Sequence, residues 1–380
     1  MKFDLFCTRP VFKDGQLIDI EKGKLVYDNM TSELVNVDGQ IIKFSNEQQL
    51  HKSDHQAFRT SEQTPASKSS SIRTLKIQLG LSCNYSCTYC SQRFVPNAPE
   101  TNPSNVEKFI MNMDHWCKSQ PEQIEFWGGE PFVYWKTLKP LAEQLRDKFP
   151  KAKFLIITNG SILTEEIIDW IEKLDISVGI SHDGPGQFVR GPDPLDDPKQ
   201  KEIMLSLFKR RHGKVSFNSM INNHNMNSKK IQDFFQNLLN TEDFAIGEGG
   251  FIDAYDDGGV QNSLSTSEDH LTLRRTTTHQ IRDQEINKFM VVHKRMNEWF
   301  NSILSQRNAE VLGQKCGMDR EDTISVDLRG NILTCQNVSA VSTAPNGRSH
   351  LIGHVSNINK ARLTTATHWS FREECTNCPV

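Results

Sequence analysis

From residue 74 onward the sequence alternates short apolar runs with longer segments of helical spacing. The apolar runs that predict buried strands are 74–80, 123–127, 153–158, 176–181, 215–221 and 244–252. The helical segments between them are 104–118, 134–148, 164–174, 198–212 and 228–240. This alternation predicts an α/β fold with a parallel sheet, either a partial barrel or a doubly wound sheet. Right-handed crossovers place the carboxyl ends of all six strands at one rim, where such folds carry their chemistry.

The composition excludes several classes of protein. Hydrophobic residues make up 36% of the 380 residues, enough for a sizeable core. The 44 basic and 47 acidic residues leave a net charge of −3, which gives no support to a nucleic-acid partner. The sequence has no run of 18 apolar residues and no apolar signal segment at its start. We therefore expect no membrane partner and a cytoplasmic location.

The regions before the alternating part have a different character. Residues 1–50 predict a β-rich unit, because four short apolar runs are separated by turn residues such as Asp14-Gly15 and Asp38-Gly39. Those runs are 17–20, 24–28, 33–37 and 40–44. Residues 51–71 contain six serines and few apolar residues, which predicts a flexible linker.

The regions after the sixth strand complete the expected domain order. Residues 72–255 would form the catalytic domain. Residues 256–310 would connect it to the rest, as a polar loop over 256–280 followed by a helix over about 281–309. Residues 311–380 would form a small domain of short strands and loops.

Three of the nine cysteines lie in one polar loop directly after the first strand. Cys83, Cys87 and Cys90 have the spacing C-x3-C-x2-C. Three thiolates on a four-iron cluster leave the fourth iron open to a substrate or cofactor. A structural zinc site would require a fourth ligand close by, and none follows in this loop. Disulfides are not expected in a cytoplasmic chain.

This loop, with Tyr89 before the third cysteine, resembles that of the radical S-adenosylmethionine (SAM) superfamily. The resemblance extends over roughly residues 74–378 and implies a partial (β/α)6 radical SAM barrel, in agreement with the six expected strands. It implies that the open iron of a [4Fe–4S] cluster chelates SAM. One electron then cleaves SAM to methionine and a 5′-deoxyadenosyl radical, which abstracts hydrogen from a substrate.

The second strand ends in Gly128-Gly129-Glu130-Pro131. The glycines allow a tight turn and a close approach to a ligand, and the proline ends the strand. This segment is similar to the family's GGEP motif, which binds the amino group of SAM. The resemblance therefore assigns these four residues to cofactor binding.

Further candidates follow later strands. Asn159 and Ser181 lie in segments similar to those of the peptide-modifying branch of the family, where the serine holds polar groups of SAM. Arg190 is a candidate for the SAM carboxylate or a solvated surface residue. His182 stands where that branch has leucine and would face either the core or the substrate. After the sixth strand, Asp253 and Asp256 could bind substrate or take up a proton, or could simply be loop acids.

The last 65 residues contain a second group of cysteines: Cys316, Cys335, Cys375 and Cys378. Residues 324–335 read as a hairpin with Gly330 in its turn. Four cysteines suffice for a fully ligated cluster or a structural zinc site. The spacing C-x13-G-x4-C resembles the SPASM/twitch extensions of radical SAM enzymes. It implies one auxiliary [4Fe–4S] cluster, or two if the chain is cut within a SPASM motif. Cys7 and Cys117 are expected in the core.

The resemblance implies an oxidoreductase that modifies a precursor peptide or protein by crosslinking, oxidation or epimerisation, as peptide maturases do. Its electron donor would be a flavodoxin or ferredoxin of low potential. The N-terminal unit could recruit a peptide by strand addition. Three alternatives remain: formylglycine formation of the anaerobic sulfatase-maturase type, dehydrogenation of a small molecule by a twitch-type enzyme, and a non-catalytic zinc or iron–sulfur module.

Overall fold

The computed structural model describes residues 2–14, 16–28, 33–42, 67–98, 102–250, 257–282, 317–344 and 347–362. The chain divides into two compact units. The first contains the described residues up to 42, and the second contains all described strands and α-helices from residue 67 onward.

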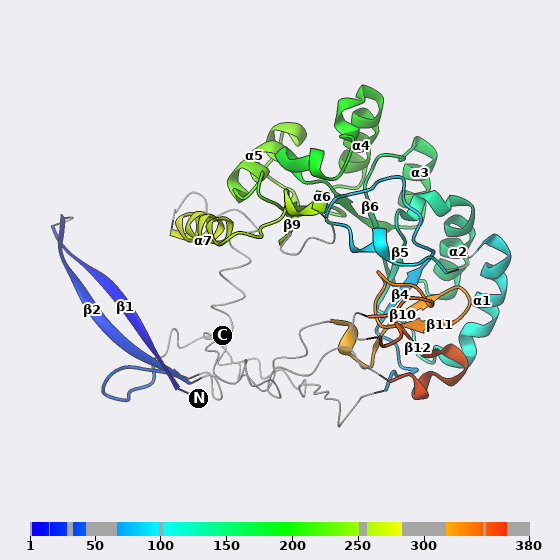
Figure 1. Cartoon of the computed structure of the whole chain (residues 1–380), viewed down its shortest axis with the longest axis horizontal. Coiled ribbons are helices and arrows are strands. Elements are labelled where there is room, and N and C mark those ends of the chain that lie inside the picture. Colours follow the sequence, from blue (N-terminus) through cyan, green and yellow to red (C-terminus); the bar gives the residue numbers. More distant parts are fainter. Residues whose placement is uncertain are drawn as a thin grey trace. The chain divides into compact units, whose positions relative to one another are not determined.

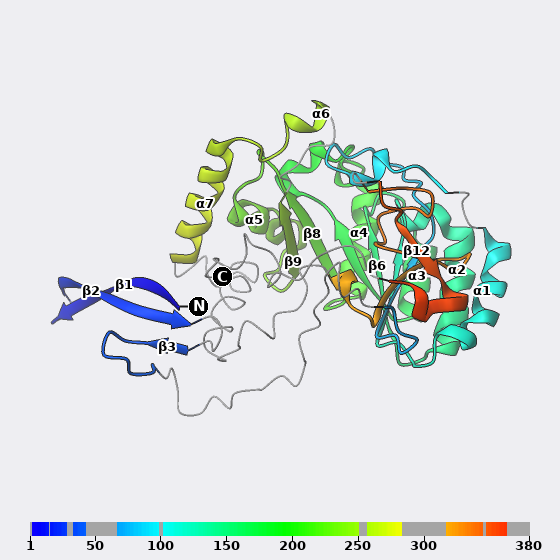
Figure 2. The same ribbon diagram turned by 60° about the horizontal axis from the view of Figure 1, so that its bottom comes forward.

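The first unit is a three-stranded antiparallel sheet (Figure 2). Strand β1 (Lys2–Lys13) pairs with β2 (Gln16–Asp28), and β2 pairs with β3 (Glu33–Val35). The turn expected at Asp14-Gly15 is confirmed, because Lys13 pairs with Gln16 and Asp14 has φ of 51°. The runs 17–20 and 24–28 prove to be one continuous strand rather than two. The expected strand at 40–44 is seen only as an isolated bridge from Ile41 to Val35, and residues 43–44 lie outside the described part.

The second unit is built on a nine-stranded sheet with the order β12-β11-β10-β4-β5-β6-β7-β8-β9 (Figure 1). Six of its parallel strands are the six expected from the sequence: β4 (Thr74–Gln78), β5 (Gln123–Trp127), β6 (Lys153–Thr158), β7 (Ile176–Ser181), β8 (Val215–Ile221) and β9 (Ala245–Gly250). Each is parallel to the next. The partial barrel itself stays a prediction.

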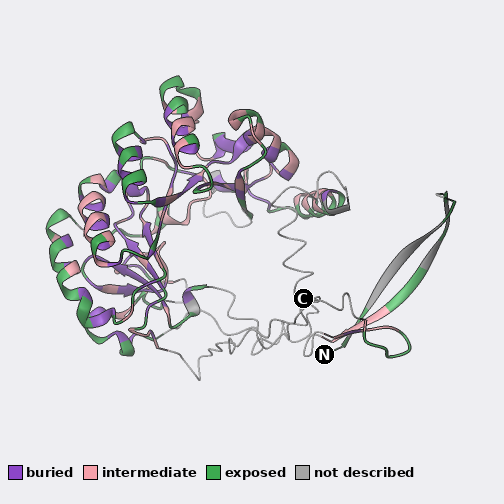
Figure 3. Cartoon of the chain, turned by 180° about the vertical axis from the view of Figure 1, so that it is seen from behind, coloured by how far each residue is buried: buried purple, intermediate pink, exposed green. Residues whose placement is uncertain are grey.

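Helices follow the first five of these strands and pack on one face of the sheet (Figures 1 and 3). They are α1 (Pro103–Trp116), α2 (Trp135–Lys148), α3 (Glu165–Lys173), α4 (Pro198–Arg210) and α5 (Ser228–Leu239), each within two residues of its expected bounds. Side chains such as Asn102, Thr164 and Asp197 cap their first turns by accepting backbone N–H bonds. The apolar face of each helix is buried against strand residues such as Phe126 and Ile156, both 0% exposed.

Three short strands extend the sheet beyond β4. Strand β10 (Thr323–Asp327) is parallel to β4, β11 (Asn331–Leu333) is antiparallel to β10, and β12 (Leu351–His354) is antiparallel to β11. The expected hairpin with a Gly330 turn is confirmed: Gly330 has φ of +89°, which favours glycine. The carboxyl end of β10 therefore lies at the same rim as the carboxyl end of β4.

Two segments differ from the expected loops. Within 256–280, the structure has the short helix α6 (Asp257–Val260) and the helix α7 (Ser267–Arg282). The signal for α7 was present in the sequence, since Thr266 and Asp269 cap its start reciprocally, with Thr266 N donating to Asp269 and Asp269 N donating to Thr266 Oγ1. The expected long loop over 256–280 is therefore wrong.

The described end of the 51–71 segment is packed rather than exposed. Lys68 is 1% exposed, and its Nζ donates to the backbone oxygens of Met318, Arg320 and Thr323 at 2.7, 2.9 and 2.5 Å. This ammonium group thus fastens residues 67–71 to the segment that leads into β10. Residues 51–66 lie outside the described part.

Candidate functional site

A cavity of about 230 Å³ opens at the rim formed by the carboxyl ends of the parallel strands. It brings together residues from six loops or strand ends that are distant in sequence. Of the expected site residues, the lining includes Cys83, Cys87, Tyr89, Cys90, Gly128, Gly129, Glu130, Asn159, Ser181 and Arg190. Pro131 does not line it, because it is buried as the first residue of the 3₁₀ helix η2 (Pro131–Tyr134).

The three cysteines of the loop are free thiols that differ in exposure. Cys87 is buried, Cys90 is half-buried and Cys83 is exposed. Burial raises the pKa of Cys87 to about 11 and raises that of Cys83 as well. Within the described ranges, no three His, Cys, Asp or Glu side chains lie close enough together to hold a single metal ion. A four-iron cluster makes a different demand, because each thiolate binds its own iron atom.

Close backbone contacts require glycine at position 129, at the end of the second strand. A Cβ on Gly129 would lie 2.4 Å from the backbone oxygens of Leu81 and Ser82. Gly129 N donates to Gly80 O at 3.0 Å, and Glu130 N donates to Ser82 O at 3.0 Å. This turn therefore lies directly against the start of the cysteine loop.

Glu130 places a buried carboxylate in the cavity wall. It is 1% exposed and accepts hydrogen bonds from Thr158 Oγ1 at 2.7 Å, Asn159 N at 2.8 Å and Phe132 N at 3.2 Å. Burial raises the pKa of this carboxyl group, and the bonds from Asn159 and Thr158 oppose the rise. No lysine, arginine or histidine in the described part of the chain forms an ion pair with it. An ammonium group in the cavity would supply the missing charge, so Glu130 fits the amino group of SAM.

Arg190 is a half-buried cation in the cavity lining. Its Nη1 donates to Tyr89 Oη at 2.7 Å and lies 3.6 Å from Asp183 Oδ1. Tyr89 Oη in turn donates to Asp183 Oδ2 at 2.5 Å. Arg190 Nε is buried and has no acceptor among the residues that the structure describes. This unused N–H fits an anionic ligand group, such as the carboxylate of SAM.

The segments after the third and fourth strands have different roles. Asn159 Nδ2 donates to Asn84 Oδ1 at 2.9 Å, which ties this segment to the cysteine loop. His182 is 0% exposed, its Nδ1 accepts from Gly184 N, and its Nε2 lies 3.0 Å from Asp193 Oδ1. His182 therefore faces the core and not the substrate. Ser181 is half-buried and lines the cavity.

The cavity also contains residues that sequence reasoning did not select. Trp127 and Met220 come from the ends of β5 and β8, and Gln92 follows the third cysteine. The positions of Trp127 and Met220 at strand ends and of Gln92 after the cysteines were visible in the sequence, but these residue types carry no specific signal.

Asn337 is a further unexpected lining residue, because it comes from the loop after Cys335. Gln92 Nε2 donates to Asn337 Oδ1 at 3.4 Å and to Gly128 O at 3.3 Å. Gln78 Nε2 donates to Gln336 O at 3.0 Å and also to Val338 O. Two glutamines thus hold the Cys335 loop at the cavity.

Several expected site residues lie outside the described part of the chain. They are Asp253, Asp256, Cys316, Cys375 and Cys378. Of the expected auxiliary ligands, the structure describes Cys335, which is half-buried. Among the described residues, no helix is long and apolar enough to cross a membrane.

Comparison with solved structures supports the fold. Native anSMEcpe with bound AdoMet superposes with a TM-score of 0.58 at 18% identity, covering 80% of this chain and 86% of that chain. At this identity the similarity establishes the fold alone.

Comparison with known sequences relates the middle of the chain to one family. The model of the Radical SAM superfamily matches residues 77–238. The chain is 25% identical over 186 residues to the radical SAM cyclopropyl synthase TigE of Paramaledivibacter caminithermalis, covering 44% of this chain and 39% of that protein. It is 30% identical over 173 residues to a serine-type anaerobic sulfatase-maturating enzyme of Bacteroides thetaiotaomicron, covering 41% of each. The chain thus spans about two fifths of the length of these relatives. Residues 77–238, which contain the three-cysteine loop and most of the cavity lining, thus match the radical SAM superfamily, whose enzymes use SAM and a [4Fe–4S] cluster.

Proposed function

We propose that this protein cleaves SAM and modifies an unactivated C–H bond of a ribosomally made precursor peptide, by crosslinking, oxidation or epimerisation. One observation carries the first part of the proposal. A single cavity is lined by Cys83, Cys87 and Cys90 together with the buried carboxylate of Glu130, which forms no ion pair within the described ranges, and the half-buried cation of Arg190.

The residues that line this cavity would have different roles. Cys83, Cys87 and Cys90 would hold the cluster, which when bound supplies the electron that converts SAM to the hydrogen-abstracting 5′-deoxyadenosyl radical. Glu130 would orient the amino group of SAM, because its hydrogen bonds from Thr158 and Asn159 fix the carboxylate in place. Arg190 would bind the carboxylate through the N–H groups left over from its bond to Tyr89.

A peptide substrate is supported by similarity to enzymes that act on protein or peptide chains. The relatives include a sulfatase-maturating enzyme. A solved structure of native anSMEcpe with bound AdoMet and Cp18Cys peptide superposes on this chain with a TM-score of 0.56. We further propose that Asp253 or Asp256 takes up a proton during the reaction. The N-terminal sheet, whose outer strands β1 and β3 pair only with β2 among the described strands, would recruit the peptide by strand addition.

The loop after Cys335 supports an auxiliary site close to the reaction. Cys335 would bind an auxiliary [4Fe–4S] cluster together with Cys316, Cys375 and Cys378. Since Asn337 of the same loop lines the SAM cavity, an electron left on the substrate would have a short path to such a cluster. A flavodoxin or ferredoxin of the cytoplasm would supply the first electron.

The test is anaerobic reconstitution with iron and sulfide, followed by reductant and SAM. We expect 5′-deoxyadenosine from the unaltered chain and none from the variant with alanine at positions 83, 87 and 90. Cys117→Ala is the matched control, because this buried thiol packs in the core away from the cavity lining. Cleavage that survives the triple change would overturn the assignment.

Formylglycine formation is the second candidate, favoured by the 30% identity to the sulfatase-maturating enzyme. An 18-residue sulfatase peptide carrying Cys or Ser, assayed by mass spectrometry, separates the two, because only this activity yields an aldehyde. Dehydrogenation of a small molecule would instead give 5′-deoxyadenosine when a small alcohol is the substrate and when no peptide is added. A zinc or iron–sulfur module without catalysis would give no 5′-deoxyadenosine with any substrate.

A further inference from the structure

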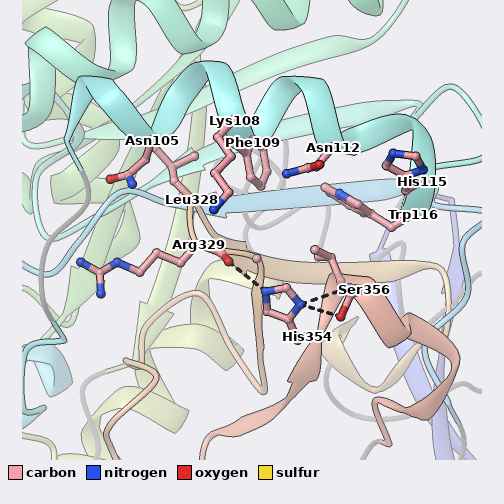
Figure 4. Close-up of a pocket in the computed structure, with 12 residues that line it drawn as sticks. Asn105, Lys108, Phe109, Asn112, His115, Trp116, Leu328, Arg329, His354 and Ser356 are labelled. Carbon is pink, nitrogen blue, oxygen red and sulfur yellow. Dashed lines mark hydrogen bonds between the residues drawn. The ribbon is translucent and has the colours of Figure 1, made fainter.

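A second cavity, of about 420 Å³, lies on the helix-covered side of the sheet, between α1 and the turn that joins β10 to β11 (Figure 4). None of the residues that line this cavity also lines the SAM cavity. They are Asn105, Lys108, Phe109, Asn112, His115, Trp116, Leu328, Arg329, Gly330, His354, Val355 and Ser356. A cavity of this volume with an apolar floor and a few polar groups is typical of small-molecule sites.

The wall of the cavity opposite α1 is held rigidly. His354 Nδ1 accepts from Ser356 N at 3.2 Å, so its Nε2 donates to Arg329 O at 3.0 Å (Figure 4). A Cβ on Gly330 would lie 2.7 Å from His354 Nε2 and 2.8 Å from Val355 Cγ2, so the turn and the histidine pack without space between them. His354 therefore fixes the backbone of Arg329 and uses both of its ring nitrogens to do so.

The charged side chains that line the cavity, those of Lys108 and Arg329, are both positive. Lys108 enters from α1 and Arg329 from the facing turn, and both are exposed. Neither forms an ion pair with a carboxylate in the described ranges. No aspartate or glutamate is among the twelve lining residues. Two unpaired cations on opposite walls favour an anionic ligand.

The floor of the cavity offers a buried hydrogen-bond donor. Trp116 is 2% exposed, and its Nε1–H has no acceptor among the residues that the structure describes. Such an unsatisfied buried donor costs free energy, which an acceptor atom on a bound ligand would recover. Phe109 and Leu328, each 4% exposed, line the cavity beside it and supply an apolar surface.

We propose that this cavity binds a small organic anion, a carboxylate or a phosphate ester with an apolar body. The body packs on Phe109 and Trp116, the anionic group lies between Lys108 and Arg329, and one acceptor atom takes the Trp116 N–H. The site is independent of the proposed reaction, because neither the cysteine loop nor Glu130 contributes to it.

The test is a titration of the cluster-reconstituted, ¹⁵N-labelled full chain, followed by the indole N–H signal of Trp116. That signal is assigned as the one absent from Trp116→Phe. The probes are 2-naphthoate and 2-naphthyl phosphate, with uncharged 2-naphthamide as the matched control. We expect the signal to move saturably with the anions and not with the amide. The tighter of the two anions identifies the ligand as carboxylate or phosphate.

Two variants test the charge assignment. Lys108→Ala and Arg329→Ala should each weaken anion binding about twofold to fivefold, as expected for exposed ion pairs. Lys201→Ala, an exposed lysine of α4, should leave binding unchanged. A Trp116 signal that no anion moves would overturn the proposal, as would equal binding of the amide or equal affinity in all three variants.

Discussion

The guanidinium group of Arg190 lies against Tyr89, the residue that precedes the third cysteine of the loop. Arg190 Nη1 is 2.7 Å from Tyr89 Oη, and Arg190 Cζ is 5.7 Å from the centroid of the tyrosine ring. Tyr89 also donates to the buried Asp183 at 2.5 Å. The phenol therefore connects the cation that faces the cavity to the carboxylate that balances its charge.

Tyr89→Phe removes this connection and keeps the ring. We expect the variant to fold and to bind its cluster, and to bind SAM about tenfold more weakly, because a hydrogen bond to a charged group is lost. Calorimetric titration with SAM measures the change. Tyr85→Phe is the matched control, since Tyr85 lines the same cavity but its hydroxyl bonds to Pro192 O. Equal SAM affinity in both variants would contradict a positioning role for Tyr89.

The carboxyl group of Glu130 should make the stability of the chain without SAM depend on pH. Because burial raises its pKa in the folded chain, the folded state holds this proton more tightly than the unfolded state does. Its contribution to the free energy of unfolding is therefore largest below its usual pKa of 4.5 and falls as pH rises through the raised value.

Glu130→Gln removes this titration. We expect the free energy of unfolding of the unaltered chain, relative to the variant, to fall as pH rises above the usual pKa of 4.5. Urea unfolding at a series of pH values measures the difference, and SAM should reduce the fall by pairing its ammonium group with the carboxylate. A difference that stays constant with pH would show that Glu130 keeps its ordinary pKa.

Gly129→Ala should destabilise the turn against the cysteine loop. The added Cβ would lie 2.4 Å from two backbone oxygens, which cannot move without disturbing the loop. We expect the free energy of unfolding to fall by about 2–3 kcal/mol. Urea unfolding measures it, with Gly317→Ala as the control, because a Cβ there meets no atom within 4 Å. Similar losses in both variants would refute the steric argument.

Lys68→Met should loosen the segment that leads into β10. The variant keeps most of the side chain's volume but leaves the oxygens of Met318, Arg320 and Thr323 without their ammonium donor. We expect a loss of about 2–3 kcal/mol in the free energy of unfolding. Faster amide exchange should appear in residues 318–327.

Lys118→Met is the matched control for Lys68. Lys118 is exposed, and its Nζ donates to Asp114 O. This change should cost less than about 1 kcal/mol. If both variants lost the same stability, the three hydrogen bonds from Lys68 Nζ to backbone oxygens would make no special contribution to the free energy of unfolding.

The six parallel strands, their helices and the Gly330 hairpin could be predicted because each depends on local spacing. Apolar runs such as 153–158 and cap residues such as Thr164 act over a few positions, so they can be read directly from the chain. The cysteine loop and the Gly128-Gly129-Glu130 turn were predictable for the same reason, and strand order then places both at one rim. The helix α7 was missed although its capping pair, Thr266 and Asp269, is equally local.

Other features depend on contacts that no local pattern encodes. Tyr89 meets Asp183 across 94 positions, and Gln78 meets Val338 across 260. Polar side chains such as these carry no periodic signal, so only the packed sheet decides which of them pair. The same is true of the cavity beside Trp116, whose walls come from α1 and from a turn more than two hundred positions later. The sequence by itself determined the strands, the helices and the cysteine chemistry, because these follow from neighbouring residues. The tertiary structure alone decided which distant side chains share a cavity, because that depends on how the strands are ordered.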